Sequence, residues 1–469
     1  MLQRLLASRG FLLLATAAVA TLAVRAFVDF GEPEVEALWP RGEVADIERL
    51  ADRDDVNVLF VLVDTLRSDR LGAYGYVRDT SPVLDRLGAR GVRFARHVSQ
   101  SSWTKASMAS LWTGMYPAHT GVTRFDDIVP DEAQMPAEVF RDAGFRTVGL
   151  YRNGWVAPTF GFDQGFEVYT RPAPLPIPAE ARRENPMISA RGTDEGAVQA
   201  AIEFLRVNSG QRWFLYLHLM DLHEYTYDAE SALFGSSYSD IYDNSIRWTD
   251  GTLDLLLRQL AELGQLKNTL VVIGSDHGEA FRERGFEGHA RYLYRETTEV
   301  PLYLLFPFRL EPGVVVETRT HNVDIWPTVF TLLGIESPAN LDGRSRVQEI
   351  LAAARGEPDA GPPTTGIAHL DQHWGQRDVG PNPTIAVIED ELRYVLQHER
   401  GRKIEQLYDA AVDSRELEDV AESQPENFAR LRVIAERHLE ARPAWGEPEV
   451  REIDELELNQ LRALGYRIP

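Results

Sequence analysis

Two polar segments combine carboxylate and imidazole side chains, which are ligand types that divalent cations take in proteins. Asp64 follows the apolar run 58–63, and Asp276 and His277 follow the run 269–273. Adjacent residues in a turn can face one point, and carboxylate plus imidazole suits a divalent cation. The pattern predicts a metal site with these three ligands. Taken singly, an aspartate after a strand is usually a helix cap or a turn residue.

A third segment, 101–117, is rich in small and hydroxylated residues and opens a predicted helix over 107–112. A hydroxyl at a helix N-terminus lies where backbone N–H groups and the helix dipole favour negative charge. Thr104 is therefore a candidate nucleophile towards phosphate or sulfate, with helix capping as the alternative. Lys105 follows it and is one of only three lysines in the chain. Its ammonium could contact an anionic oxygen; the alternative is a solvated loop lysine.

Distant segments of this kind need a scaffold that gathers them. Continuous apolar runs are typical of strands buried on both faces of a parallel sheet, and they occur at 58–63, 147–151, 213–217, 269–273 and 300–305. Helix-like stretches lie between them at 131–143, 193–207 and 246–263. The alternation predicts an α/β fold with a large, doubly wound, mostly parallel sheet. Ligands bind at the carboxyl ends of such strands.

The two ends of the chain differ in composition from this middle part. Arg4 and Arg9 precede an uncharged apolar run over 11–24, which is shorter than the roughly 20 residues of a spanning helix. The run predicts a signal peptide or membrane anchor and an extracytoplasmic location, periplasmic or at the cell surface. A buried N-terminal helix is the alternative. The expected organisation is a leader or anchor at 1–28, a linker at 29–55, a catalytic domain at 56–340, a Pro- and Gly-rich connection at 341–380 and a small C-terminal α+β subdomain at 381–469. Within the subdomain we expect a hairpin over 385–396 and a helix over 427–442.

Composition excludes several classes of function. The 469 residues include 72 acidic and 49 basic side chains, for a formal net charge of −23. Such a surface repels phosphodiester backbones, so nucleic acid is not an expected partner. An anionic substrate would need a local positive site, most simply a metal ion. The absence of cysteine excludes disulfides, thiolate ligands and cysteine nucleophiles.

In order and spacing, the polar and apolar segments together resemble the sulfatase branch of the alkaline phosphatase superfamily. The matching stretches are 57–75, 81–94, 102–121, 214–224, 271–289 and 323–334, and the tail at 407–418 is similar to that family's C-terminal subdomain. The resemblance covers most of the chain from about 56 to 420. It implies the sulfatase-like fold and a metal-dependent enzyme acting on an anionic ester.

Roles carry over at the matching positions as implications of the resemblance. The metal ligands are Asp64, Asp276, His277 and Thr104, and Thr104 is also the nucleophile. Contacts to the anionic substrate fall on Lys105, which counts among the catalytic residues, on His223 and, in a matching loop, on Asn153. The histidine that protonates the leaving group is His289, and Arg67 lies in another matching loop.

The sequence departs from true sulfatases at the nucleophile. Those enzymes use a formylglycine made from Cys or Ser, whereas position 104 is Thr, and Ala106 and Met108 replace the usual Pro and Arg. The paired aspartates expected after the first strand are here Asp64 and Thr65. Both changes favour relatives with a threonine nucleophile, which include lipid-headgroup phosphotransferases and phosphodiesterases. Zinc or manganese is the expected cofactor, and calcium or magnesium remains open.

A threonine can form a phosphothreonine, but it cannot expel sulfate by collapsing to an aldehyde as a formylglycine hydrate does. We therefore expect a hydrolase or transferase acting on phosphate mono- or diesters through Thr104. Sulfate ester hydrolysis is the first alternative. The second is a catalytically silent, membrane-tethered binding protein of the same fold. The oligomeric state is left open by the sequence.

Overall fold

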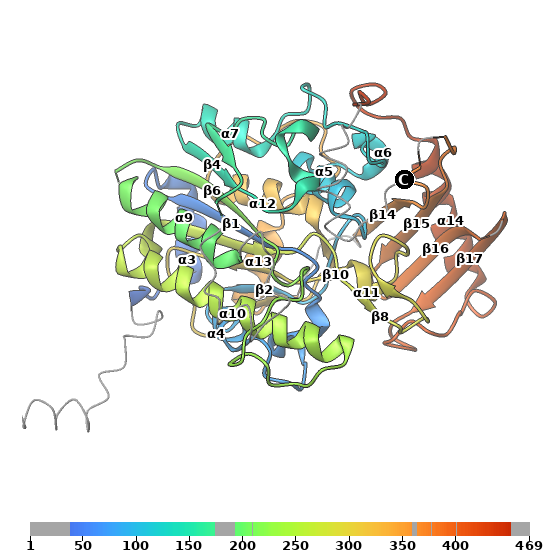
Figure 1. Ribbon diagram of the computed structural model, residues 1–469, viewed down its shortest axis with the longest axis horizontal. Helices are drawn as coiled ribbons and strands as arrows, with labels where there is room; N and C mark the ends of the chain where they lie inside the picture. The colour runs from blue at the N-terminus through green and yellow to red at the C-terminus, as the bar shows by residue number, and fades with distance from the viewer. Residues whose placement is uncertain are drawn as a thin grey trace, which may run out of the picture.

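The computed structural model describes residues 38–173, 193–208, 210–358, 364–376, 378–399 and 401–451. Within them, a large central sheet lies between two layers of helices, and a smaller sheet lies beside it (Figure 1). The eight strands of the large sheet, in spatial order, are β12 (Val314–Val316), β2 (Val92–Phe94), β11 (Leu302–Leu305), β7 (Thr269–Gly274), β1 (Asn57–Val63), β6 (Trp213–Leu219), β4 (Arg146–Leu150) and β5 (Val168–Thr170).

The register confirms the expected mostly parallel sheet. β1 pairs in parallel with both β6 and β7, so that Val61 lies between Leu217 and Ile273. Only β11 among these strands is antiparallel to its neighbours β7 and β2. The carboxyl ends of β1, β6 and β7 therefore lie together at one edge of the sheet.

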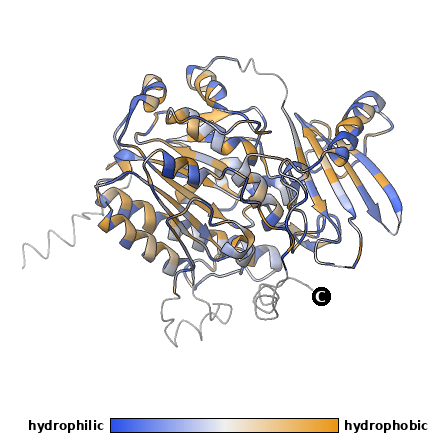
Figure 2. Ribbon diagram, turned by 90° about the horizontal axis from the view of Figure 1, so that it is seen from above, coloured by the Kyte–Doolittle hydropathy of each residue, from blue (hydrophilic) through white to orange (hydrophobic). Residues whose placement is uncertain are grey.

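Every residue of β1 is buried, because helices cover both faces of the sheet. Val58, Phe60 and Leu62 pack into one core, and Leu59 and Val61 into the other. Figure 2 shows the hydrophobic residues concentrated on the central strands and on the helix sides that face them. The continuous apolar runs of the sequence thus reflect burial on two faces.

The helices divide between the two faces. Residues of α3 (Val44–Glu48), α5 (Thr104–Thr113), α7 (Pro136–Asp142), α12 (Ile325–Leu332) and α13 (Val347–Arg355) pack into the first core. Residues of α4 (Pro82–Gly88), α9 (Asp194–Val207) and α10 (Tyr238–Glu262) pack into the second. The predicted helices at 131–143, 193–207 and 246–263 correspond to α7, α9 and α10, although α10 begins eight residues earlier than its prediction.

The small sheet is larger than the predicted hairpin. It is antiparallel, in the order β14 (Thr365–Asp371), β15 (Pro383–Glu389), β16 (Leu392–Glu399) and β17 (Arg402–Asp409), and α14 (Pro425–Glu440) packs on it. The segment 341–380, expected as a plain connection, contains both α13 and β14. Its high content of Pro and Gly hid a strand that pairs with β15 over seven residues.

The part of the expected linker that the structure describes is folded. Trp39, Ile47 and Leu50 are buried, and the Trp39 Nε1–H donates to the Phe306 carbonyl at 2.8 Å. The described residues from 38 to 55 therefore pack with the large sheet, since Trp39, Ile47 and Leu50 lie in its two cores. The leader or anchor predicted at 1–28 lies outside the described residues, and within these residues no helix combines the length and the apolar character needed to cross a bilayer.

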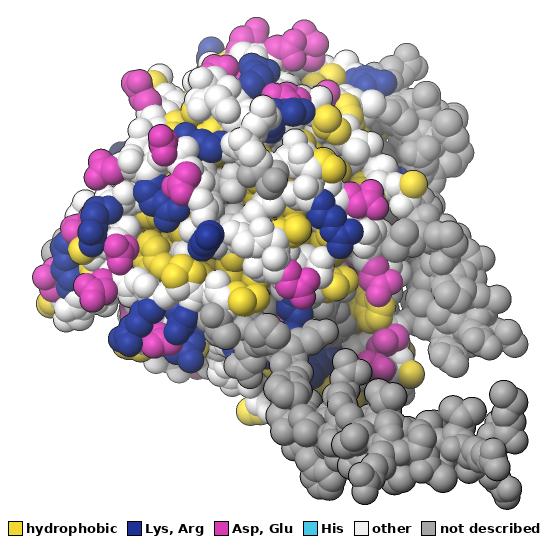
Figure 3. Space-filling view, turned by 90° about the vertical axis from the view of Figure 1, so that its left-hand side faces the viewer, with side chains coloured by type: hydrophobic (Ala, Val, Ile, Leu, Met, Phe, Trp, Pro, Cys, Tyr) yellow, Lys and Arg dark blue, Asp and Glu magenta, His cyan; other side chains and the backbone are white. Residues whose placement is uncertain are grey.

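The remaining strands form a three-stranded sheet and a two-stranded sheet, in the orders β10-β3-β13 and β8-β9, and two short α-helices complete the described elements of this kind. They are α6 (Pro117–Thr120), α11 (Arg295–Thr298), β3 (His97–Val98), β8 (Ala280–Phe281), β9 (Glu287–Gly288), β10 (Glu299–Val300) and β13 (Thr320–His321). On the face shown in Figure 3, Lys and Arg side chains alternate with Asp and Glu among the described residues. Among the described residues on that face, basic side chains form no continuous stripe of the kind that nucleic-acid binding uses.

Candidate active site

Asp64, Asp276 and His277 converge at the carboxyl ends of β1 and β7, as the sequence predicted. All three are fully buried, and one ligand atom of each lies within 4.8 Å of the others. The His277 Nδ1–H donates to the Gly278 carbonyl at 3.0 Å, which leaves the Nε2 lone pair directed towards the carboxylates. Nε2 lies 3.4 Å from Asp276 Oδ2 and 3.9 Å from Asp64 Oδ1.

This donor set fits a divalent cation. Among the described residues, the buried oxygens Asp64 Oδ1 and Asp276 Oδ2 have no hydrogen-bond partner. Burial and the charge of Asp64 raise the pKa of Asp276. Burial also opposes ionisation of Asp64, but His223 and His218 more than offset it and lower its pKa. The two buried carboxylates carry negative charge that a cation would neutralise, and the imidazole nitrogen that faces the same point can serve as a further ligand.

Two further side chains hold Asp64 in place. Asp64 Oδ2 accepts hydrogen bonds from Asn153 Nδ2 at 2.7 Å and from His218 Nε2 at 3.0 Å. The other ring nitrogen of His218 contacts the Tyr216 hydroxyl at 2.7 Å. These contacts occupy one oxygen of Asp64, so the other oxygen faces Asp276 and His277.

Thr104 is the first residue of α5, where the helix dipole favours a negative charge. Its Oγ1 lies 3.1 Å from His277 Nε2 and accepts from Asn153 Nδ2 at 3.3 Å. Ser107, one turn further along, donates to the Asp276 carbonyl at 2.5 Å. The helix that carries the candidate nucleophile is thereby attached to the segment that carries the candidate ligands.

Two more histidines stand beside this cluster. The ring of His289 stacks on His277 with centroids 4.6 Å apart and lies 5.0 Å from the ring of His223. Burial lowers the pKa of His223 to about 4, against the opposing charge of Asp64. Burial also disfavours the charged form of His289, but the charge and hydrogen bond of Glu279 outweigh it and raise the pKa of His289.

Lys105 lies apart from the cluster in its contacts. It is fully buried, and its Nζ donates to the Phe125 carbonyl at 2.7 Å and lies 3.7 Å from the centre of the Phe160 ring. Burial lowers the pKa of Lys105 to about 7, against the charges of Asp127 and Asp126. No described contact of the ammonium reaches the carboxylates or Thr104, so direct binding of an ester by Lys105 stays a prediction.

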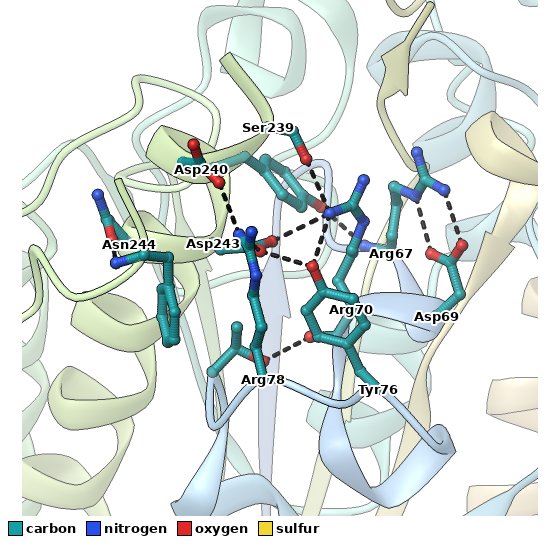
Figure 4. A network of polar contacts seen from close by, with 12 residues as sticks. Arg67, Asp69, Arg70, Tyr76, Arg78, Ser239, Asp240, Asp243 and Asn244 are labelled. Carbon is teal, nitrogen blue, oxygen red and sulfur yellow. Dashed lines mark hydrogen bonds and ion pairs between the residues drawn. The ribbon is translucent and has the colours of Figure 1, made fainter. Parts of the chain in front are cut away.

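Buried ion pairs support the loops that carry the candidate residues. The Arg152 guanidinium, next to Asn153, pairs with three carboxylates from the first turn of α9 and the loop around His223, namely Asp194, Asp221 and Glu224. Figure 4 shows a second network after β1, in which Arg67 pairs with Asp69 while Arg70 and Arg78 meet at Asp243. Arg67 thus supports the site rather than standing among its ligands.

Two residues of this cluster received no role from the sequence. His218 directly follows the predicted run 213–217, but in the structure it lies within β6. Glu279 directly follows the Asp-His-Gly turn and accepts from His289. The only sequence signal for either was an ionisable side chain in or beside an apolar strand.

Solved structures share the fold of this chain. A phosphonate monoester hydrolase from Silicibacter pomeroyi matches with a TM-score of 0.63 and 20% identity, over 82% of this chain and 96% of that chain. A 2-O GAG sulfatase matches with a TM-score of 0.65 and 19% identity, over 86% of this chain and 96% of that chain.

Curated relatives are similar in sequence. The ulvan-active sulfatase of Formosa agariphila is 24% identical over 65% of this chain and 66% of the relative. The arylsulfatase K of Xenopus laevis is 22% identical over 80% of this chain and 81% of the relative. The chain thus spans slightly less than two thirds of the first relative and more of the second.

Family models match both parts of the chain. A model described as N-sulphoglucosamine sulphohydrolase, C-terminal, matches residues 283–440. The model described as Sulfatase matches residues 56–335, more than half of the sequence. The chain therefore belongs to the sulfatase family.

Proposed function

We propose that the protein is a metal-dependent hydrolase or transferase that acts on phosphate mono- or diesters, with Thr104 as the nucleophile. The observation that carries the proposal is the position of the Thr104 hydroxyl. It lies at a helix N-terminus, 3.1 Å from His277 Nε2 and beside two buried carboxylate oxygens without partners. A side-chain alcohol in this setting is suited to attack at an anionic ester.

Each residue has a distinct part in the proposed reaction. Asp64, Asp276 and His277 would hold the divalent ion, which supplies positive charge against the ester oxygens and favours the alkoxide. The Thr104 hydroxyl loses its proton to water, and its Oγ1 bonds to phosphorus as the ester P–O bond breaks. His289 gives its proton to the departing oxygen. Water, or an acceptor alcohol in a transferase, then releases the phosphoryl group from Thr104.

Asn153 and His223 orient the reactants. The Asn153 amide donates to both Asp64 and Thr104, so it aligns the nucleophile with the ligand set. The partly buried His223 ring stands beside His289 and can donate to a non-bridging ester oxygen. The leader or anchor predicted at 1–28 would place this activity outside the cytoplasm.

Sulfate ester hydrolysis is the second candidate, and the family membership favours it. The relatives include an ulvan-active sulfatase and an arylsulfatase. With threonine at position 104, sulfate would have to leave from a sulfated threonine by attack of water. A phosphonate monoester hydrolase shares the fold, so phosphonate esters belong in the same comparison.

A panel of aryl phosphates, phosphodiesters, phosphonates and sulfates, each with zinc, manganese, calcium or magnesium, tests the substrate class. We expect turnover of the phosphorus esters, retention of part of it in Thr104→Ser, and its loss in Thr104→Ala with the fold intact. Sulfate turnover exceeding that of all phosphorus esters would replace the first candidate by the second. Full turnover in Thr104→Ala would overturn both.

Metal analysis separates an enzyme from a silent binding protein of the same fold. We expect the purified protein to take up a divalent ion and Asp276→Ala to lose it, because Asp276 contributes one of two facing oxygens. Asp243→Ala is a matched control, since that carboxylate is buried but engaged by Arg70 and Arg78. Equal ion content in all three proteins would favour the silent alternative.

A further inference from the structure

Glu279 is a buried carboxylate beside the candidate acid, and the proposed reaction gives it no part. It is 2% exposed, and its Oε2 lies 2.9 Å from His289 Nδ1. Its Oε1 is buried and has no hydrogen-bond partner among the described residues. A buried carboxylate in this position needs a partner that carries or can take a positive charge. The His289 ring is the nearest such partner that the structure provides.

The carboxylate fixes which nitrogen of His289 carries out proton transfer. An ionised carboxylate only accepts hydrogen bonds, so His289 Nδ1 must be the donor in this contact. Transfer to a substrate then has to use Nε2. The His289 ring stacks on His277, with ring centroids 4.6 Å apart, and contacts the His223 ring at a tilt, with centroids 5.0 Å apart.

The backbone around His289 is also fixed relative to the nucleophile. Gly288 and Ala290 both have positive φ, 94° and 56°, and alanine rarely adopts this conformation. The Ala290 N–H donates to the Ser102 carbonyl at 2.7 Å, two residues before Thr104. The position of His289 therefore depends on the segment that carries the nucleophile, and its ring orientation depends on Glu279.

Arg67 contacts the backbone of Glu279. Its Nη1 donates to the Glu279 carbonyl at 2.7 Å and to Glu283 Oε1 at 2.6 Å. The same guanidinium forms two hydrogen bonds with Asp69, at 2.8 and 2.7 Å, which Figure 4 shows. The loop after β1, which begins with Asp64, is thus tied to the segment that carries the Glu279–His289 pair.

We propose that Glu279 is a positioning residue for the proposed reaction, which orients His289 so that Nε2 protonates the departing oxygen. The inference rests on the proposed function. As the bond between phosphorus and the leaving oxygen breaks, that oxygen takes the Nε2 proton. His289 becomes neutral and keeps its Nδ1–H on the Glu279 carboxylate, so its tautomer and orientation do not change during the step. In general acid–base catalysis a carboxylate often fixes the tautomer and orientation of the imidazole in this way.

The test is the dependence of kcat on the leaving group in Glu279→Gln. Alkyl phosphodiesters need a proton on the departing oxygen, whereas p-nitrophenyl esters do not. We expect kcat to fall about 100-fold for alkyl leaving groups and about 10-fold or less for p-nitrophenyl. Glu287→Gln, a carboxylate on the same hairpin that pairs with Arg282, should leave both rates unchanged. An equal loss for both leaving groups in Glu279→Gln would mean a merely structural role and would overturn the proposal.

A double-mutant cycle with His289→Ala gives a second readout. If Glu279 acts through His289, adding Glu279→Gln to His289→Ala should cost little more activity; multiplied losses would contradict the proposal. Failure of the proposed function itself is recognised separately, because Thr104→Ala would then keep its turnover. Should Glu279→Gln not fold, the imidazole ¹⁵N shifts of His289 in the unaltered protein decide. They should report a protonated Nδ1, and a bare Nδ1 would refute the inference.

Discussion

At the scale of single residues, the site depends on side chains that hold a candidate metal ligand in place. His218 and Asn153 both donate to one oxygen of Asp64, so the second oxygen is left for the cation. Such outer partners fix the orientation and basicity of a ligand. His218 directly follows the predicted strand 213–217, but only its contact with Asp64 shows that it holds a candidate ligand in place.

His218→Ala should weaken the affinity for the divalent ion by about 10–100-fold, because Asp64 loses a buried donor. Titration of the metal-free protein with manganese or zinc measures this affinity. Tyr216→Phe, which removes only the hydroxyl that contacts His218, should have a smaller effect. An unchanged affinity in His218→Ala would show that Asp64 is held by other contacts.

Lys105 shows what a position in the sequence leaves open at this scale. The family resemblance implies a contact with the substrate, which stays a prediction, and the ammonium lies against the Phe125 carbonyl and the Phe160 ring. Neighbours in a helix point in different directions, and which residue faces the ligand depends on the packing of distant loops. Asp64, Asp276 and His277 were predictable as a group because parallel strands bring their carboxyl ends to one edge.

At the scale of elements, the turn after β7 is set by a close approach of two backbones. A Cβ on Gly278 would lie 2.3 Å from the Glu296 carbonyl oxygen, whereas a Cβ on Gly274, within the strand, meets nothing closer than 3.5 Å. The turn between them carries Asp276 and His277. Its geometry therefore requires glycine at 278 but not at 274.

Gly278→Ala should destabilise the protein by about 1–3 kcal/mol and reduce turnover, because the turn must shift away from α11. Gly274→Ala should be tolerated on both counts. Chemical unfolding and steady-state kinetics of the two variants measure the difference. Similar stability and activity in both would contradict the role given to this contact.

The small sheet shows how an element can escape prediction. β15 and β16 were recognisable as a hairpin, but β14 lies in a segment interrupted by Pro and Gly and is recognised only through its pairing with β15. Strand pairing of this kind is a long-range property. The described part of the predicted linker is folded for the same reason, because Trp39 and Leu50 are buried against residues far along the chain.

At the scale of the whole molecule, buried neutral histidines tie stability to pH. His97, in β3, contacts Thr320 Oγ1 in β13 and Asn322 Oδ1 directly after β13, each at 2.8 Å. Burial lowers its pKa to about 3, against the hydrogen bond to Asn322 Oδ1, which acts in the opposite direction. The unfolded chain takes up a proton near pH 6.5, while the folded protein does not take it up until about pH 3.

Stability should therefore fall as pH drops from about 6.5 towards 3, with His97 contributing about 1.4 kcal/mol per pH unit. Glutamine at position 97 cannot titrate, so in His97→Gln the proton uptake on unfolding should be smaller by about one proton and the pH slope of the unfolding free energy correspondingly lower. Urea unfolding of both proteins between pH 7 and 4 gives the two slopes. Equal slopes would show that the His97 ring is protonated in the folded protein.

The proposed reaction depends on covalent chemistry at Thr104, and one measurement addresses this directly. The enzyme is quenched with acid during turnover of a phosphodiester, and the peptide that contains residue 104 is analysed by mass spectrometry. We predict a phosphoryl group on Thr104 that is absent without substrate and in Thr104→Ala. Steady turnover with an unmodified Thr104, together with an active Thr104→Ala variant, would contradict the role of Thr104 as the nucleophile.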